Sequence, residues 1–200
     1  MIPVLKPVVW ERDGGDLHLM ADVREMRTLA DPDGRVEGLL RLLSAGDRTT
    51  RELAAAMARQ FPGTTPADVA EGIDGLDQLG LLEDAGRATT LTQAEQDRYF
   101  TNLVFFQSFA SLTRPKEDMQ RRLAAAHVLI LGTGGLGSTV LMHLAGAGVG
   151  RLTLLEHDVV EERNFSRQYT YRHADIGRLK ADRAAEVLCV ASTLPTSRHP

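Results

Sequence analysis

The sequence predicts an α/β chain with two different parts, and three observations carry this prediction. Residues 1–85 show short strand patterns followed by helical patterns, an order typical of an α+β domain. From Val128 onward, a short apolar strand runs directly into a glycine-rich turn and then a helix. Between these parts, residues 86–97 are small and polar, which is typical of a linker.

The composition excludes several protein classes. Hydrophobic residues make up 43% and charged residues 25% of the chain, as in ordinary globular proteins. The nearly apolar stretch from Val128 to Gly150 is interrupted by glycines, which favours a strand–turn–helix over a membrane span. The first residues lack the long apolar region of a secretory signal. A single cysteine, Cys189, excludes an internal disulfide. We therefore expect a cytoplasmic protein with no membrane contact.

Charge is unevenly divided along the chain. Residues 1–92 contain 16 acidic and 10 basic side chains, whereas residues 93–200 contain 11 acidic and 13 basic ones. An acidic first part argues against binding a nucleic-acid backbone, and a mildly basic second part suits a polyphosphate ligand.

Three strands are predicted near the start. The patterns Val4–Trp10 and Asp16–Met20 flank Asp13-Gly14-Gly15, which is a hairpin signal. Pro7 marks the first pattern as an edge strand, because proline cannot donate to a sheet ladder. A third short strand is expected near Met26–Ala30.

Three helices should follow, and residues that favour helix ends mark their boundaries. The first covers residues 36–43 and stops at Gly46. Thr49 or Thr50 can cap the second helix through its side-chain oxygen. The third begins at Thr65, where a proline follows in the first helical turn.

This order, with the segments T-x-x-E-L-A and L-x-x-L-G-L-L-E, predicts a winged helix-turn-helix. DNA is the usual ligand of that fold. The third helix, however, carries four acids and no lysine or arginine: Asp68, Glu71, Asp74 and Asp77. Such a helix is unsuited to the major groove, so no nucleic-acid partner is expected.

In its order of strands and helices, the segment up to about residue 85 resembles the PqqD-like domains, which recognise the leader segment of ribosomally made precursor peptides. The resemblance implies that a leader peptide adds a strand beside the third strand and lies against the third helix. A winged helix used only for packing or dimerisation remains an alternative.

The glycine-rich turn G-T-G-G-L-G lies between the strand Val128–Leu131 and a helix, the context in which G-x-G-x-x-G indicates nucleotide binding. In this pattern Gly132 permits the turn, and Gly137 lets the helix pack on the strand. Gly134 and Gly135 allow phosphates to approach the main chain. The positive end of the helix then attracts anionic oxygens.

The residues beyond the turn separate two kinds of nucleotide site. A second strand, Arg151–Leu155, ends at Glu156, where an acid is placed to bond ribose hydroxyls. This much fits an NAD-dependent dehydrogenase as well as an ATP enzyme. Asn164, Arg167 and Lys180 follow, and displacement of pyrophosphate requires cations near the phosphates. The pattern therefore favours ATP, with a dehydrogenase-like NAD binder kept as an alternative.

The segment from Arg98 to Leu188 resembles the ThiF/MoeB/HesA family, which is related to the ubiquitin-activating enzymes. The resemblance implies use of Mg-ATP to adenylate a carboxyl or amide, with release of pyrophosphate. By motif position it implies nucleotide contacts for Gly132, Gly134, Gly135, Gly137, Glu156, Asp158, Asn164, Arg167 and Lys180. Glu156 stands where the family usually has aspartate, and Arg167 with Lys180 would be the catalytic pair.

Two departures from the family pattern are visible. Thr101 occupies the place of an arginine that reaches the neighbouring subunit's ATP site, so Arg98 or Arg114 substitutes or that contribution is absent. The aspartate that binds Mg²⁺ in the family lies further along the chain than this sequence extends. We therefore expect no metal ligand within these residues and interpret the nucleotide part as an N-terminal half only.

The sequence thus predicts a peptide-recognition domain of the winged-helix type over residues 1–88 and a linker with a helical segment over 89–126. Residues 127–200 would form a partial Rossmann-like ATP-binding domain. The predicted function is ATP-dependent adenylylation of a precursor peptide or a ubiquitin-like small protein, by a homodimer. The alternative is a non-catalytic leader-peptide-binding protein with a vestigial nucleotide domain.

Overall fold

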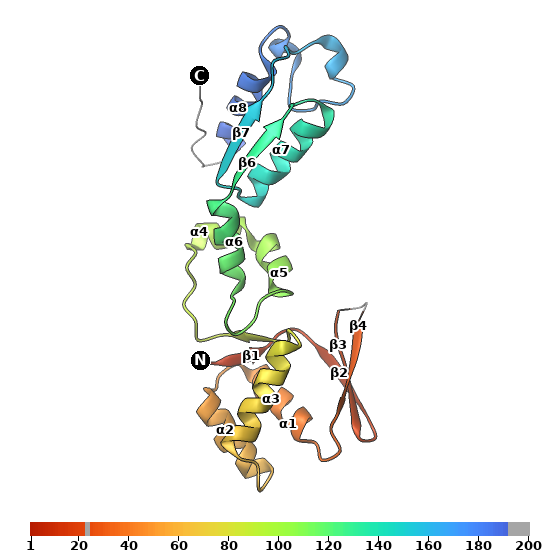
Figure 1. The fold of residues 1–200 in the computed structure, drawn as a ribbon, viewed down its shortest axis with the longest axis vertical. Coiled ribbons are helices and arrows are strands. Elements are labelled where there is room, and N and C mark those ends of the chain that lie inside the picture. Colours follow the sequence, from red (N-terminus) through yellow and green to blue (C-terminus); the bar gives the residue numbers. More distant parts are fainter. Residues whose placement is uncertain (23–24, 192–200) are drawn as a thin grey trace. The chain divides into compact units, whose positions relative to one another are not determined.

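Two units make up the computed structural model, which describes residues 1–22 and 25–191 (Figure 1). The first unit comprises Met1–Gln96 and Leu103–Asp118, and the second comprises Asp97–Asn102 and the chain from Met119 onward. Residues 192–200, which we predicted to be the end of the nucleotide-binding domain, lie outside the described part. Within the described residues, no helix is long and apolar enough to cross a membrane.

The strands of the first unit form two small antiparallel sheets. One has the order β2-β3-β4, with β2 at Val9–Asp13, β3 at Asp16–Asp22 and β4 at Glu25–Ala30. The other pairs β1, Pro3–Leu5, with β5, Leu82–Asp84. The predicted hairpin turn and third strand are confirmed, since Asp13 pairs with Asp16 and β4 covers the expected residues.

The prediction of one strand over Val4–Trp10 was wrong. The chain leaves the β1-β5 sheet after Leu5 and enters the β2-β3-β4 sheet at Val9. Pro7 lies in this break, because proline lacks an amide donor and cannot continue a ladder. The partner strand β5 was not predicted, since three residues are too few to show an alternating pattern.

The predicted helix boundaries of the first unit are confirmed. The three helices are α1 at Arg35–Ala45, α2 at Thr50–Gln60 and α3 at Pro66–Gln78. Thr49 rather than Thr50 caps α2, in a reciprocal capping box with Glu52. Thr65 caps α3 in the same way. The helices enclose a leucine-rich core with Leu17, Leu19, Leu40, Leu43, Leu53 and Leu82 fully buried.

Part of the segment before the nucleotide part belongs to this unit. Three short helices lie there, α4 at Gln93–Arg98, α5 at Phe100–Gln107 and α6 at Lys116–Ala125. Leu112 packs into the leucine core, and the Lys6 ammonium donates to the carbonyl oxygens of Gly80 and Ala110 at 2.7 and 2.6 Å. These non-local contacts fix residues 103–118 on the first unit.

The second unit is built from two parallel strands, β6 at His127–Leu131 and β7 at Arg151–Leu155. They are joined by α7, Gly135–Ala147, and followed by two 3₁₀ turns, η1 at Glu162–Asn164 and η2 at His173–Asp175. Helix α8, Lys180–Ala191, ends the described chain.

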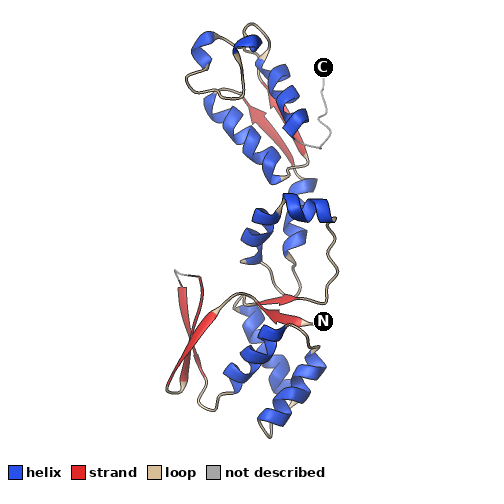
Figure 2. Ribbon diagram, turned by 180° about the vertical axis from the view of Figure 1, so that it is seen from behind, coloured by secondary structure: helices blue, strands red, loops and turns tan. Residues whose placement is uncertain are grey.

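Both long helices of the second unit cover the same face of the strands. Helix α7 contacts α8 and β6, and α8 contacts β7 (Figure 2). Ile130 on β6 is buried with Leu141 of α7 and Leu188 of α8. On the opposite face, Leu129, Leu131 and Leu155 are more than half exposed. Among the described residues, this apolar face of the two strands is therefore left uncovered.

Candidate functional site

The glycine-rich motif, which comprises the loop between β6 and α7 and the first turn of α7, has a geometry that only glycine permits at two positions. Gly132 adopts a φ of 83°, in the left-handed region that disfavours residues with a side chain. A Cβ atom on Gly137 would lie 1.9 Å from the carbonyl oxygen of Gly132. The first turn of α7 is thus folded directly onto the start of the loop.

Arg167 and Gln168 lie against the middle of this loop. A Cβ atom on Gly135 would lie 3.3 Å from Cγ of Arg167, and one on Gly134 would lie 3.8 Å from Nε2 of Gln168. Gln168 is buried, and its Oε1 has no hydrogen-bond partner among the described residues. The structure therefore brings together Gly134, Gly135 and Arg167, which are well separated in the sequence.

The Arg167 guanidinium forms no ion pair with any described acid. Its Nη1 donates to the carbonyl oxygen of Arg163 at 3.2 Å and to Oγ of Ser166 at 3.4 Å. The side chain is exposed beside the loop. An arginine in this position can bind phosphate oxygens through two parallel hydrogen bonds without first leaving a carboxylate.

Lys180 is held at the start of α8 by contacts with Asp158, in the segment that follows β7. Its amide donates to the carbonyl oxygen of Asp158 at 2.9 Å, and its ammonium lies 3.0 Å from Oδ2 of the same residue. The amide of Val160 donates to the carbonyl oxygen of Arg178. This short pairing of two segments buries Lys180, which is 5% exposed.

Asn164 shapes the turn that carries Arg167. Its Oδ1 accepts from the amide of Glu161 at 2.9 Å, and its carbonyl oxygen accepts from the amides of Arg167 and Gln168. The side chain is buried. A direct contact of Asn164 with a phosphate remains a prediction.

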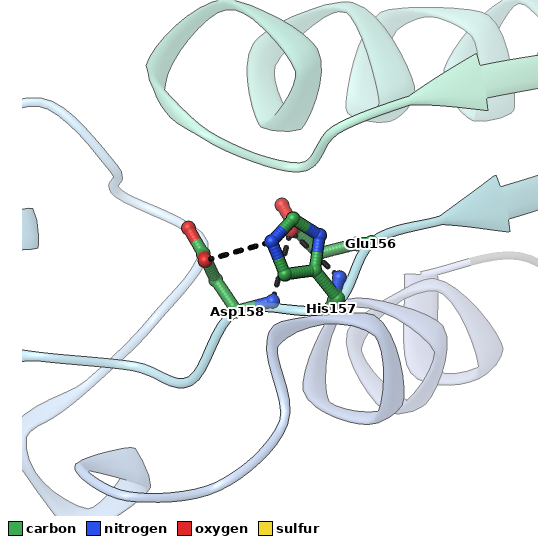
Figure 3. A group of neighbouring side chains, drawn as sticks. All are labelled: Glu156, His157 and Asp158. Carbon is green, nitrogen blue, oxygen red and sulfur yellow. Dashed lines mark hydrogen bonds and ion pairs between the residues drawn. The ribbon is translucent and has the colours of Figure 1, made fainter.

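The carboxylate of Glu156 is turned towards the protein. Its Oε2 accepts from the amide of Thr133 at 2.8 Å and from the Thr133 hydroxyl at 3.2 Å. Its Oε1 accepts from the amides of His157 and Asp158, at 2.9 and 3.0 Å (Figure 3). The contact of Glu156 with ribose also remains a prediction.

These hydrogen bonds control the ionisation of Glu156. Partial burial by itself would raise the pKa, but the bonds from Thr133, Asp158 and His157 outweigh it and lower the pKa from 4.5 to about 2. The ionised form therefore stabilises the folded state above pH 4.5, and this contribution is lost as the pH falls towards 2.

We accordingly expect Glu156→Gln to remove one component of acid denaturation. The wild-type free energy of unfolding should fall more steeply than that of the variant as the pH decreases from 4.5 to 2. Urea unfolding followed by circular dichroism at several pH values measures the difference. Parallel curves for the two proteins would show that the carboxylate is not held as described.

Glu156, His157 and Asp158 bring possible metal-ligand atoms within 4.8 Å of one another (Figure 3). Both oxygens of Glu156 are, however, engaged by donors, and Asp158 is paired with Lys180. His157 is almost fully exposed. These groups do not fit a Mg²⁺ ion, which prefers free carboxylate oxygens in a near-octahedral arrangement.

Two residues of the site were missed by the sequence analysis. Thr133 and Tyr171 are both buried, and the Tyr171 hydroxyl donates towards the carbonyl and hydroxyl oxygens of Thr133, each at 2.8 Å. Thr133 occupies a variable position of the glycine motif, and Tyr171 lies 38 residues away. No local pattern connects them.

The structure does not assign a substitute for the family's arginine that reaches the neighbouring subunit's ATP site, whose place Thr101 occupies. Thr101 lies in α5, and the Arg114 guanidinium donates to the carbonyl oxygen of Phe109 within the first unit. A role for Arg98 or Arg114 at another copy's site remains a prediction.

The family of the nucleotide part follows from comparison with known proteins. Residues 107–193 match the ThiF family. The chain carries a ThiF-family domain. The resemblance inferred from the glycine motif and the residues after it is thereby confirmed.

Curated relatives of this ThiF-family domain are adenylyltransferases. The probable adenylyltransferase/sulfurtransferase MoeZ of Mycobacterium tuberculosis is 37% identical over 107 residues, which is 54% of this chain and 26% of the relative. The adenylyltransferase and sulfurtransferase MOCS3 of Mus musculus is 54% identical over 69 residues, 34% of this chain and 15% of the relative. The chain thus spans about a quarter or less of these relatives.

Solved structures match nearly the whole chain. The structure of E. coli MccB with ATP has a TM-score of 0.70 at 19% identity. The match covers 98% of this chain and 55% of the MccB chain. PaaA has a TM-score of 0.64 at 25% identity, covering 95% of this chain and 57% of its own. A third structure, of MccB in complex with N-formylated MccA, has a TM-score of 0.64 at 18% identity, with 98% and 53% covered. The chain is therefore a mixed α/β fold with Rossmann-like ThiF neighbours.

Proposed function

We propose that the ThiF domain of this chain binds ATP and contributes to adenylylation of a carboxyl or amide group on a precursor peptide or small protein. The observation that carries the proposal is the position of Arg167. Its side chain lies against the glycine loop and is not paired with any described acid. A dehydrogenase has no requirement for such a cation, because its reaction develops no charge on a leaving phosphate.

The chemistry explains why two cations are useful. A carboxylate oxygen of the substrate forms a bond to the α-phosphorus, and the bond from that phosphorus to the bridging oxygen of the β-phosphate breaks. Negative charge then accumulates on the departing pyrophosphate. Arg167 and Lys180 would stabilise this charge. Because the negative charge on the pyrophosphate is larger in the transition state than in bound ATP, the two cations would lower the barrier.

We propose further that the first unit is a winged-helix, PqqD-like domain that holds the peptide. Strand β4 is the outer strand of its sheet, so one edge is available for strand addition. A pocket of about 410 Å³ adjoins this sheet and is lined from β3, β4, the end of α3 and α5, including Leu19, Arg27, Leu81, Val104 and Phe109. The similar fold of MccB, solved in complex with N-formylated MccA, supports a peptide as substrate class.

A charge placed in this pocket is expected to weaken peptide binding. Ala21 lines the pocket from β3 and is exposed, so Ala21→Arg should fold normally while its side chain occupies the space of a bound apolar residue. We expect affinity to fall about tenfold or more, the cost of losing one buried anchor residue. Fluorescence anisotropy with a labelled candidate leader peptide measures the effect.

Val9→Arg is the matched control for that experiment. Val9 is an exposed residue of the same sheet, but it lies on β2, at the opposite edge from β4, and does not line the pocket. Its substitution should leave peptide affinity within about twofold of wild type, as for surface positions in general. Equal losses from both substitutions would remove the pocket from the proposal.

Calorimetry with ATP and, separately, with NADH tests the nucleotide assignment. We expect saturable binding of ATP and none of NADH, followed by peptide-dependent exchange of labelled pyrophosphate into ATP. Preference for NADH would overturn the proposal in favour of the dehydrogenase-like reading.

The non-catalytic alternative is favoured by one observation, because Thr101 stands where the resembling family has an arginine that reaches the neighbouring subunit's ATP site. In that case a folded chain would bind the peptide without ATP turnover.

We also propose that the protein is cytoplasmic and forms a homodimer. The exposed aromatic residues Phe105 and Phe109 support the dimer. Sedimentation velocity measures the oligomeric state.

A further inference from the structure

Thr133 is held from two sides by side chains distant in the sequence. Glu156, at the end of β7, accepts from both its amide and its hydroxyl. Tyr171, from the segment between η1 and η2, donates to its carbonyl oxygen. Thr133 is completely buried and Tyr171 is 4% exposed, so water does not compete for these bonds. Every polar group of this loop residue is therefore engaged within the protein.

The four hydrogen bonds to Glu156 leave little capacity for a ligand. A carboxylate offers about four lone-pair sites, two on each oxygen. Both oxygens of Glu156 accept two bonds each, from Thr133, His157 and Asp158. A ribose hydroxyl could bind Glu156 only by displacing one of these donors, which would leave a partly buried amide without a partner.

We infer that Glu156, Thr133 and Tyr171 form a clamp that holds the glycine loop in its phosphate-binding shape, and that Glu156 acts as a positioning residue rather than as the ribose ligand. Thr133 directly precedes Gly134 and Gly135, whose main chain the phosphates of bound ATP would approach. Fixing all its polar groups fixes the direction of the next amides. This inference rests on the proposed binding of ATP.

Comparison of two nucleotides separates the two roles of Glu156. ATP and 2′,3′-dideoxy-ATP differ only in the ribose hydroxyls. If Glu156 positions the loop, Glu156→Gln should weaken both ligands equally, by about 10- to 100-fold, the range for losing hydrogen bonds to a charged group. If Glu156 binds the ribose, the substitution should weaken ATP alone and bring both ligands to the same affinity, which would overturn the inference.

Tyr171→Phe tests the other side of the clamp, because it removes one hydroxyl and keeps the ring in the core. We expect about a fivefold to tenfold loss for both nucleotides, in line with one buried neutral hydrogen bond. Tyr169→Phe is the matched control, since Tyr169 lies two residues earlier and is 84% exposed. An equal effect of both tyrosine substitutions would contradict the clamp.

Hydrogen exchange gives a readout that does not depend on nucleotide binding. In Tyr171→Phe and in Thr133→Val, the amides of residues 133–135 should exchange about tenfold faster, the equivalent of about 1.4 kcal/mol. The amides of β6 should be unchanged, which distinguishes loosening of the loop from unfolding of the unit. Unchanged exchange at residues 133–135 overturns the clamp even if ATP binds. Failure of the wild type to bind ATP overturns the proposed function, and the exchange result then decides the clamp separately.

Discussion

Gly137→Ala is expected to destabilise the second unit by about 3 kcal/mol or more and to abolish ATP binding, the upper end of the range for overpacking. The new methyl group would lie 1.9 Å from the carbonyl oxygen of Gly132. A backbone atom cannot move aside as a flexible side chain can, so either α7 shifts or the loop opens. Urea unfolding and calorimetry with ATP measure the two consequences.

Gly146→Ala provides the control within the same helix. No heavy atom of a described residue lies within 4 Å of the position that its Cβ would take, apart from the helix's own backbone and adjacent residues. Alanine is the better helix former by about 1 kcal/mol, so this variant should be as stable as wild type or more so. A Gly137→Ala protein with normal stability and ATP affinity would show that the loop does not fold onto α7 as described.

Lys180→Ala should reduce pyrophosphate exchange by about 100- to 1,000-fold, comparable to removing one preorganised donor from a transition-state site. Lys180 is buried at the start of α8, so its charge acts in a less polar environment than a surface lysine. Its partner Asp158 is half exposed and can be solvated by water after the substitution. The folded unit should therefore survive, with only a small change in the free energy of unfolding.

Arg178→Ala is the matched control, because Arg178 lies in the same turn but is 42% exposed and pairs with Glu186 and Asp175. We expect exchange activity close to wild type. Full activity of Lys180→Ala would remove this lysine from the site. Activity absent from the wild type itself, with peptide binding intact, would favour the non-catalytic alternative.

The amino-acid sequence alone determined the local features of this protein. Thr49 and Thr65 begin helices, Gly46 ends one, and Gly132 to Gly134 join a strand to the helix that begins at Gly135. Each of these depends on the backbone preference or the short-range hydrogen bonds of a few consecutive residues. Such preferences act before any distant contact forms, so the sequence pattern is sufficient to predict them.

Tertiary structure decided how distant residues combine. It split the first predicted strand so that β1 pairs with β5, about 80 positions away. It turned Glu156 towards Thr133, joined Thr133 to Tyr171, and buried Lys180 beside Asp158. The direction of a long side chain depends on which donors surround it after folding. Those donors come from separate segments, and their positions follow only from the packing of α7 and α8 on the two parallel strands.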